Sequence, residues 1–224
     1  MSIKVVKFGG SSLADADRFR RVAEIIKADP ERRYAVPSAP GKRFSDDIKI
    51  TDMLYQCYNL AKEPSTKEEF ETCYNSICAR FLGIIADLGL DFDISGELSY
   101  IKNAILGRAG RDFAASRGEY RNSIILAKYL KYDFIDAESV IFFKDNGVLD
   151  AEKTNQIMRQ ELLQHKNAVV PGFYGVMPNG TIKTFSRCGS DITGSLVARA
   201  VNADIYENWT DVSGFMVADP RIVP

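Results

Sequence analysis

A strand pattern, a glycine turn and a helix pattern follow one another directly at the N-terminus. Residues 3–6 read IKVV and are apolar except for Lys4, the segment KFGGSS occupies residues 7–12, and a helical pattern begins near Asp15. Glycines let a backbone approach a ligand closely, and the free N–H groups of a helix N-terminus carry partial positive charge. Together with Lys7, this order predicts a phosphate-binding turn in an α/β fold. The alternative is a plain tight turn in which Lys7 is an ordinary surface charge.

Two common phosphate-binding fingerprints do not occur in the chain. There is no GxxxxGK[ST] loop and no GxGxxG following a predicted strand. A nucleotide-binding fold of another kind is therefore expected.

Composition limits the class of protein and the kind of partner. The chain has 224 residues, of which 46% are hydrophobic and 26% charged, enough for one large domain or two small ones. Because 29 basic and 30 acidic residues give a net charge of -1, the sequence does not predict a surface for nucleic acid or an anionic membrane. The partner is predicted to be a small molecule.

Targeting signals and metal motifs are also missing from the sequence. No apolar run approaches the length of about 20 residues that crosses a bilayer, and no signal peptide precedes the first strand, so a cytoplasmic protein is expected. Four cysteines, at positions 57, 73, 78 and 188, lack CxxC spacing. With the single His165 they do not form a zinc motif, so free thiols and no metal site are predicted.

Alternating strand and helix patterns predict a largely parallel sheet between layers of helices. Strands are expected at residues 3–6, 34–36, 134–135, 140–143, 168–170 and 205–209, a hairpin turns at Asn179-Gly180, and helices begin near residues 15, 151 and 191. Residues 51–130 are predicted to be helical. Their apolar stripe at residues 70, 74, 77, 81, 84 and 88 is best explained by core packing.

Polar residues and glycines follow several of the predicted strands. These residues are Gly9, Gly10, Ser38, Gly172, Thr210 and Asp211. Since ligands of parallel sheets bind at the carboxyl ends of strands, one shared crevice is expected. The polar loop at residues 37–47, which follows the second strand, is long enough to be functional.

Charged residues also stand on loops in the last third of the chain. Arg187 precedes a predicted helix and suits bidentate binding of a carboxylate or phosphate. Asp191 begins that helix, where it fits a helix cap as well as a functional carboxylate. Thr210 and Asp211 also fit a plain turn, and Trp209 is predicted to belong to the core rather than to stack on a base.

In order along the chain, these motifs resemble those of the aspartate kinases of the amino-acid kinase superfamily. The resemblance spans essentially all 224 residues and rests on KFGGSS at 7–12, SRGE at 116–119, GF at 172–173, RCGSD at 187–191, and WTDV at 209–212 running on to DPR at 219–221. It implies a three-layer α/β/α sandwich with a mainly parallel central sheet and a helical subregion. Residues 1–224 would form the catalytic domain without its C-terminal part and without the regulatory ACT domains.

The resemblance implies an enzyme that moves the γ-phosphoryl of MgATP to the side-chain carboxylate of L-aspartate. The product, 4-phospho-L-aspartate, would serve lysine, threonine and methionine synthesis. Since a carboxylate is already ionised at neutral pH, no general base is needed, and catalysis would depend on positioning and charge neutralisation. ATP with Mg²⁺ is the implied cofactor, and a homodimer is the implied assembly of the full-length protein.

The matching motifs imply a role for each site residue. Lys7 and Asp191 would be catalytic, with Lys7 contacting the transferring phosphoryl. The implied substrate contacts are Thr51, Glu119, Phe173, Arg187 and Ser190. The implied ATP contacts are Lys7, Gly9, Gly10, Ser11, Thr210, Asp211 and Arg221. Arg187 would bind the α-carboxylate of aspartate, while Glu119 and Asp191 would meet its ammonium group. The alternative for Glu119 is a solvated helix face on which nearby arginines pair with it.

The chain departs from the family pattern at several positions. Cys188 replaces a glycine, and at positive φ a cysteine would cost roughly 1 kcal/mol or more and could shift Arg187. An insertion at residues 44–49 bears on the assignment of Thr51, and Met216 stands where relatives often have a tyrosine near the nucleotide. Because the sequence ends at Pro224, before a further ATP-site lysine of the family, residues 1–224 alone are expected to be weakly active or inactive.

Two other functions stay open at this point. One is a related kinase that acts on glutamate, N-acetylglutamate, carbamate or uridylate. An N-acetylated substrate has no ammonium for Glu119 and Asp191 to bind, and a uridylate pocket needs no such pair. The other is a nucleotide- or amino-acid-binding module without catalysis.

Overall fold

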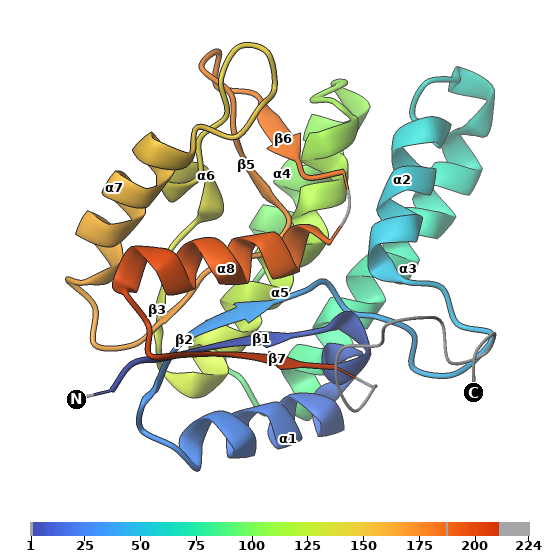
Figure 1. Ribbon diagram of the computed structural model, residues 1–224. Coiled ribbons are helices and arrows are strands. Elements are labelled where there is room, and N and C mark those ends of the chain that lie inside the picture. The colour runs from blue at the N-terminus through green and yellow to red at the C-terminus, as the bar shows by residue number, and fades with distance from the viewer. Residues whose placement is uncertain (1, 187, 211–224) are drawn as a thin grey trace, which may run out of the picture.

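The structure, a computed structural model, describes residues 2–186 and 188–210 as a sheet between layers of helices (Figure 1). The main sheet has five strands, all paired in parallel. In spatial order they are β3 (Asp133–Phe134), β4 (Ala168–Val169), β2 (Arg32–Pro37), β1 (Lys4–Phe8) and β7 (Ile205–Trp209). A separate antiparallel hairpin consists of β5 (Tyr174–Val176) and β6 (Ile182–Thr184).

Helices cover both faces of the sheet. They are α1 (Ala16–Lys27), α2 (Ile50–Leu60), α3 (Lys67–Asp87), α4 (Ser95–Leu106), α5 (Arg111–Leu130), α6 (Ala137–Val140), α7 (Ala151–Leu162) and α8 (Gly189–Val201), with short 3-10 helices η1 (Gly10–Leu13) and η2 (Pro64–Thr66). Figure 1 shows α8 and α1 on opposite sides of β1 and β7. The predicted three-layer fold with a parallel sheet is confirmed.

Side-chain alternation along the strands divides the apolar interior into two cores. In β1, Val5 packs into the core under α6, α7 and α8, whereas Val6 packs into the core under α1, α3 and α5. In β2, Tyr34 and Ala35 divide in the same way. The helical stripe predicted from residue 70 onward lies in the second of these cores, as expected.

Helix α1 begins where the sequence predicts, because the Asp15 side chain accepts a hydrogen bond from the Arg18 N–H at 2.9 Å. The strand predicted at residues 140–143 is wrong in most of its length. Asp136 caps α6, which takes up Val140, and Phe142 and Phe143 make only isolated bridges. The cap at Asp136 therefore starts a helix where the apolar run predicted a strand.

Strand register brings the ends of three strands together. Phe8 of β1 is paired with Pro37 of β2 and with Trp209 of β7, so the residues that follow these strands emerge side by side. The hairpin turn at Asn179-Gly180 is also confirmed, with Gly180 at φ 80°. All four cysteines are free thiols, and none of the helices in the described part of the chain is both long and apolar enough to cross a membrane.

Candidate functional site

The glycine turn after β1 is in backbone contact with the loop after β2. The Gly41 N–H donates to the Gly10 carbonyl at 2.8 Å. A Cβ on Gly10 would lie 2.7 Å from the Ala39 carbonyl oxygen, and a Cβ on Gly41 would lie 2.6 Å from the Gly10 carbonyl carbon. Both positions therefore require glycine, because any side chain would push the two loops apart.

Lys7 is buried, and its charge is paired with a carboxylate on α8. Its Nζ lies 2.9 Å from Oδ1 of Asp191, which also accepts a hydrogen bond from the Asn208 side chain at 3.1 Å. Only 7% of Lys7 is exposed, so the reading of Lys7 as a surface charge is wrong. The helix-cap reading of Asp191 is wrong as well, since the N-cap of α8 is Cys188 and the Asp191 carboxylate meets Lys7.

Glu119 is buried on α5 and lacks an ion-pair partner among the described residues. It is 5% exposed, and its Oε2 has no hydrogen-bond partner there. Burial raises the pKa of this carboxyl to about 8, although hydrogen bonds from the Glu119 and Ala39 amides and the nearby Arg117 charge oppose the shift. The solvated-face alternative for Glu119 is therefore wrong.

One cavity of about 480 Å³ lies at the carboxyl ends of the strands, and the glycine turn and Glu119 line it, whereas Lys7 and Asp191 do not. Six of the predicted site residues line it, namely Gly9, Gly10, Ser11, Thr51, Glu119 and Thr210. Six more lining residues belong to the loop after β2: Ser38, Ala39, Pro40, Gly41, Lys42 and Lys49. Ser38 was predicted only as a residue that follows a strand, and the other five were not predicted as site residues. The signal for them was the length of this loop and its two lysines.

Phe173 and Ser190 lie beside the start of α8 rather than among the residues that line this cavity. The Phe173 N–H donates to the Thr193 hydroxyl at 3.2 Å, with Phe173 at φ 81°. Ser190 packs against Gly172, where a Cβ would lie 2.5 Å from the Ser190 hydroxyl oxygen. The ion pair of Lys7 with Asp191 connects this region to the glycine turn. The predicted Arg187, Asp211 and Arg221, and also Met216, lie outside the described residues.

Cys188 has the left-handed backbone conformation that the sequence suggested, with φ 48°, and its side chain is exposed. It lies three residues before Asp191 in the segment that starts α8. The predicted cost of a side chain at this position therefore applies.

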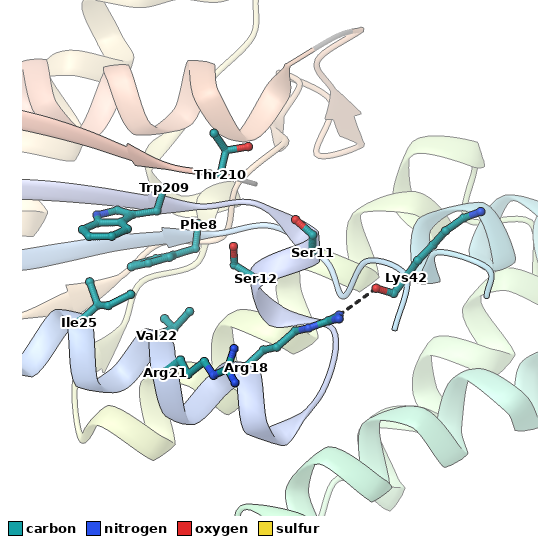
Figure 2. A pocket seen from close by; sticks show the side chains of 10 residues that line it. All are labelled: Phe8, Ser11, Ser12, Arg18, Arg21, Val22, Ile25, Lys42, Trp209 and Thr210. Atoms are coloured by element: carbon teal, nitrogen blue, oxygen red, sulfur yellow. Dashed lines mark hydrogen bonds between the residues drawn. The ribbon is translucent and has the colours of Figure 1, made fainter. Parts of the chain in front are cut away.

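A second cleft, of about 470 Å³, lies on the α1 side of the sheet (Figure 2). Phe8 and Trp209 stack there with ring centroids 6.1 Å apart, and Arg18 and Arg21 stand on α1 opposite them. Trp209 is half-buried against the core, in agreement with the prediction. Ser11, Lys42 and Thr210 line both cavities, so the two adjoin.

The geometry suits a ligand that carries charges of both signs. An unpaired buried carboxylate can bind an ammonium group, whereas Lys7 and the backbone of the glycine turn can bind an anion. Within residues 2–186 and 188–210, no group of three or more His, Cys, Asp or Glu side chains could hold a metal ion.

Comparisons with known proteins show the family of the chain. The chain matches the amino acid kinase family over residues 2–224. Aspartokinase 3 of Bacillus subtilis is 33% identical and lysine-sensitive aspartokinase 3 of Escherichia coli is 27% identical, and each alignment covers 99% of this chain and 51% of the relative. The chain thus spans about half the length of these curated relatives.

Solved structures with the same fold include two aspartate kinases. That of Clostridium acetobutylicum is 50% identical with a TM-score of 0.92, and the match covers 100% of this chain and 51% of that one. Escherichia coli aspartokinase III in complex with aspartate and ADP is 28% identical with a TM-score of 0.81, covering 99% of this chain and 52% of that one.

Proposed function

The chain belongs to the amino acid kinase family, and from this premise we propose that the protein is an aspartate kinase. It moves the γ-phosphoryl of MgATP to the side-chain carboxylate of L-aspartate. The observation that carries the proposal is the cavity in which buried Glu119 lies across from the glycine turn. The 33% identity to an aspartokinase and the likeness to a structure with aspartate and ADP support the choice of substrates.

The amino-acid end of the site is formed by Glu119 and Thr51. A carboxylate removed from water and left without a cation favours a ligand that brings one, and the ammonium group of aspartate does so. An N-acetylated acid has no such group. Arg187 is proposed to bind the α-carboxylate, with Phe173 and Ser190 beside it. Specificity for an unmodified amino acid follows from this pairing of charges.

The phosphate end of the site is formed by Lys7 and the glycine turn. The Gly9 N–H donates to the Trp209 carbonyl at 3.2 Å, so we assign the phosphate contacts to Gly10 and Ser11 and give Gly9 the role of shaping the turn. Asp191 holds the Lys7 ammonium in place by an ion pair. When the phosphoryl group binds, Lys7 would contact it instead, and the Asp191 carboxylate would then be available to the ammonium of aspartate. Thr210, Asp211 and Arg221 are proposed to complete the nucleotide site.

Phosphoryl transfer between two anions is limited by their mutual repulsion, and cationic and N–H groups of the site would reduce this repulsion. The aspartate carboxylate needs no base, so Lys7 and the backbone amides act by positioning and by neutralising charge. Mg²⁺ would enter with the nucleotide, held mainly by phosphate oxygens and water, as is usual for this ion.

The test is a coupled assay of ADP release with the complete protein and a panel of acceptors. The panel consists of aspartate, glutamate, N-acetylglutamate, carbamate and uridylate. We expect aspartate to give the highest kcat/KM and hydroxylamine to trap the acyl phosphate. A clear preference for glutamate would refute the substrate, and tight binding of ATP and aspartate without ADP release would indicate a non-catalytic binding module.

A further inference from the structure

The loop at residues 38–49 joins β2 to α2 and contains no helix or strand. Its first half lines the cavity. Because the loop has no regular secondary structure, its carbonyl groups do not find hydrogen-bond donors in a helix or a sheet. Such groups need partners from elsewhere in the fold. The shape of this wall therefore depends on the side chains that hold the loop.

Arg80 of α3 supplies several of these partners from behind the loop. Its guanidinium donates to the carbonyls of Gly41 and, at 3.3 Å, of Ile48, so it holds the loop near both ends. Arg80 is 8% exposed, and its charge is balanced by Asp47, whose carboxylate lies 2.9 Å away. Asp47 in turn accepts the Arg43 N–H at 2.9 Å.

The same guanidinium also contacts the segment that follows the glycine turn. Its Nη2 donates to the Ala14 carbonyl at 3.4 Å as well as to Gly41. Ala14 directly follows η1, which begins at Gly10, and Gly41 is in direct backbone contact with Gly10. One planar group with several donors thus joins the two walls of the cavity, which a lysine ammonium cannot do with the same geometry.

Other side chains each hold the loop at one residue or at two adjacent residues. Asn122 of α5 donates to the Ser38 carbonyl at 2.7 Å, and Arg18 of α1 donates to the carbonyls of Lys42 and Arg43 at 2.9 and 3.1 Å. In the described part of the chain, neither side chain donates a hydrogen bond to the η1 segment. Arg80 does not line the 480 Å³ cavity, so any influence on a ligand acts through the backbone that it holds.

We infer that Arg80 is a positioning residue that sets the spacing between the glycine turn and the 38–49 loop, and hence between the phosphoryl donor and the acceptor carboxylate. This inference rests on the proposed function. Misplacement of reacting groups by about 1 Å can cost about 100-fold in rate. The loss of Arg80 should therefore reduce kcat, in addition to any effect on stability.

The experiment compares Arg80→Gln and Arg80→Lys with Met158→Ala in the complete protein. Met158 is fully buried in the other core, away from the site, so its variant controls for lost stability alone. At a temperature where all variants are folded, we expect Arg80→Gln to lower kcat by about 10- to 100-fold, Arg80→Lys to recover part of it, and Met158→Ala to retain the wild-type kcat. Equal kcat in Arg80→Gln and wild type would overturn the inference, as would equal losses in Arg80→Gln and Met158→Ala.

Amide hydrogen exchange separates this inference from the proposed reaction. We expect faster exchange at residues 39–43 in Arg80→Gln than in Met158→Ala, whichever acid the enzyme phosphorylates. Unchanged exchange there would refute the positioning role even if aspartate is the substrate. If Arg80→Gln does not fold, Asp47→Asn tests the same contact, because it removes the negative charge that balances Arg80. Asp47 also accepts hydrogen bonds from Arg43, so exchange is then compared at residues 39–42, where we expect the same pattern more weakly.

Discussion

At the scale of single residues, the proposed contact of Glu119 with the ammonium of aspartate should link ligand binding to pH. Its pKa is raised to about 8 by burial, so at pH 7 the carboxyl holds a proton in the free protein. An ammonium ligand favours the ionised form, so that binding should release this proton. We therefore expect the affinity for aspartate to rise with pH, by up to about tenfold per unit, between pH 6 and 8.

Calorimetric titration in buffers of different ionisation enthalpy measures the proton released. Glu119→Gln should abolish the release and lower the affinity for aspartate. Glu24→Gln is the matched control, because Glu24 undergoes the same chemical change on an exposed face of α1. Proton release that persists in Glu119→Gln would show that another group is responsible.

The same carboxyl should also make stability depend on pH. Because its folded-state pKa lies above the unfolded value of 4.5, the folded chain binds more protons between these values, and its stability falls as pH rises from about 4.5 to 8. Relative to wild type, Glu119→Gln should gain stability across this window, by on the order of 1 kcal/mol per pH unit. Urea unfolding at several pH values measures the difference, and a flat difference would contradict the assignment of the shift to Glu119.

Cys188 stores backbone strain next to the start of α8. Since φ is 48° there, Cys188→Gly should raise the free energy of unfolding by about 1 kcal/mol. Cys188→Ala retains the Cβ at the same φ and should give no such gain. Thermal unfolding of both variants decides, and an equal gain in the two would place the effect in the thiol rather than in the backbone.

At the scale of helices and loops, α5 is set against α2 and the 38–49 loop through Gly118. A Cβ at this position would lie 2.9 Å from the Ala39 Cβ and 3.4 Å from an Ile50 methyl carbon. Gly118→Ala should therefore separate α5 from α2 and cost about 1–3 kcal/mol, with weaker binding of the amino acid because Glu119 moves with the helix.

Gly83 of α3 offers the matched control for that substitution. An added Cβ there meets nothing within 4 Å, so Gly83→Ala should gain up to about 1 kcal/mol from helix propensity alone. Chemical denaturation of the two variants should give opposite signs. Stabilisation by both would mean that the contact at Gly118 is loose.

The elements with strong periodicity were predictable, because burial of one face leaves a repeating pattern in the sequence. The stripe on α3 and the alternation in β1 are examples. At residues 140–143 the same logic failed, since a short apolar run does not distinguish a strand from a buried turn of helix, and the cap at Asp136 decided the outcome.

Site residues with reactive or charged side chains in a motif were predictable from the sequence. The residues of the cavity wall, which is formed by loop backbone, were less predictable. Lys7 and Asp191 stand out by residue type near the ends of a strand and a helix, and Glu119 stands out through the SRGE motif within α5. The walls at Ala39, Gly41 and Lys49 depend on how the 38–49 loop is held, and the residue that holds it, Arg80, lies on a helix far along the chain. No local pattern reveals such a contact.

At the scale of the whole molecule, the site lies where distant segments meet at one edge of the sheet. Lys7 comes from β1, Glu119 from α5 and Asp191 from α8, and these elements pack into both cores. Ligands that bind there should therefore stabilise the fold as a whole. A ligand at 100 times its Kd adds about 2.7 kcal/mol to the free energy of unfolding.

Two anionic ligands bound together should stabilise the protein by less than the sum of their separate effects, because the phosphate and the acceptor carboxylate repel each other. In the proposed site Lys7 would reduce this repulsion, so its loss should enlarge the shortfall. We expect thermal shifts of the complete protein with aspartate, with a non-hydrolysable ATP analogue and with both to show a small shortfall in wild type and a larger one in Lys7→Gln. Lys4→Gln is the control, because Lys4 lies on the same strand but pairs with Asp29 at its opposite end. If the shortfall is the same in wild type and Lys7→Gln, Lys7 does not screen the two anions from each other, and its buried charge serves only to hold Asp191 and α8 against the sheet.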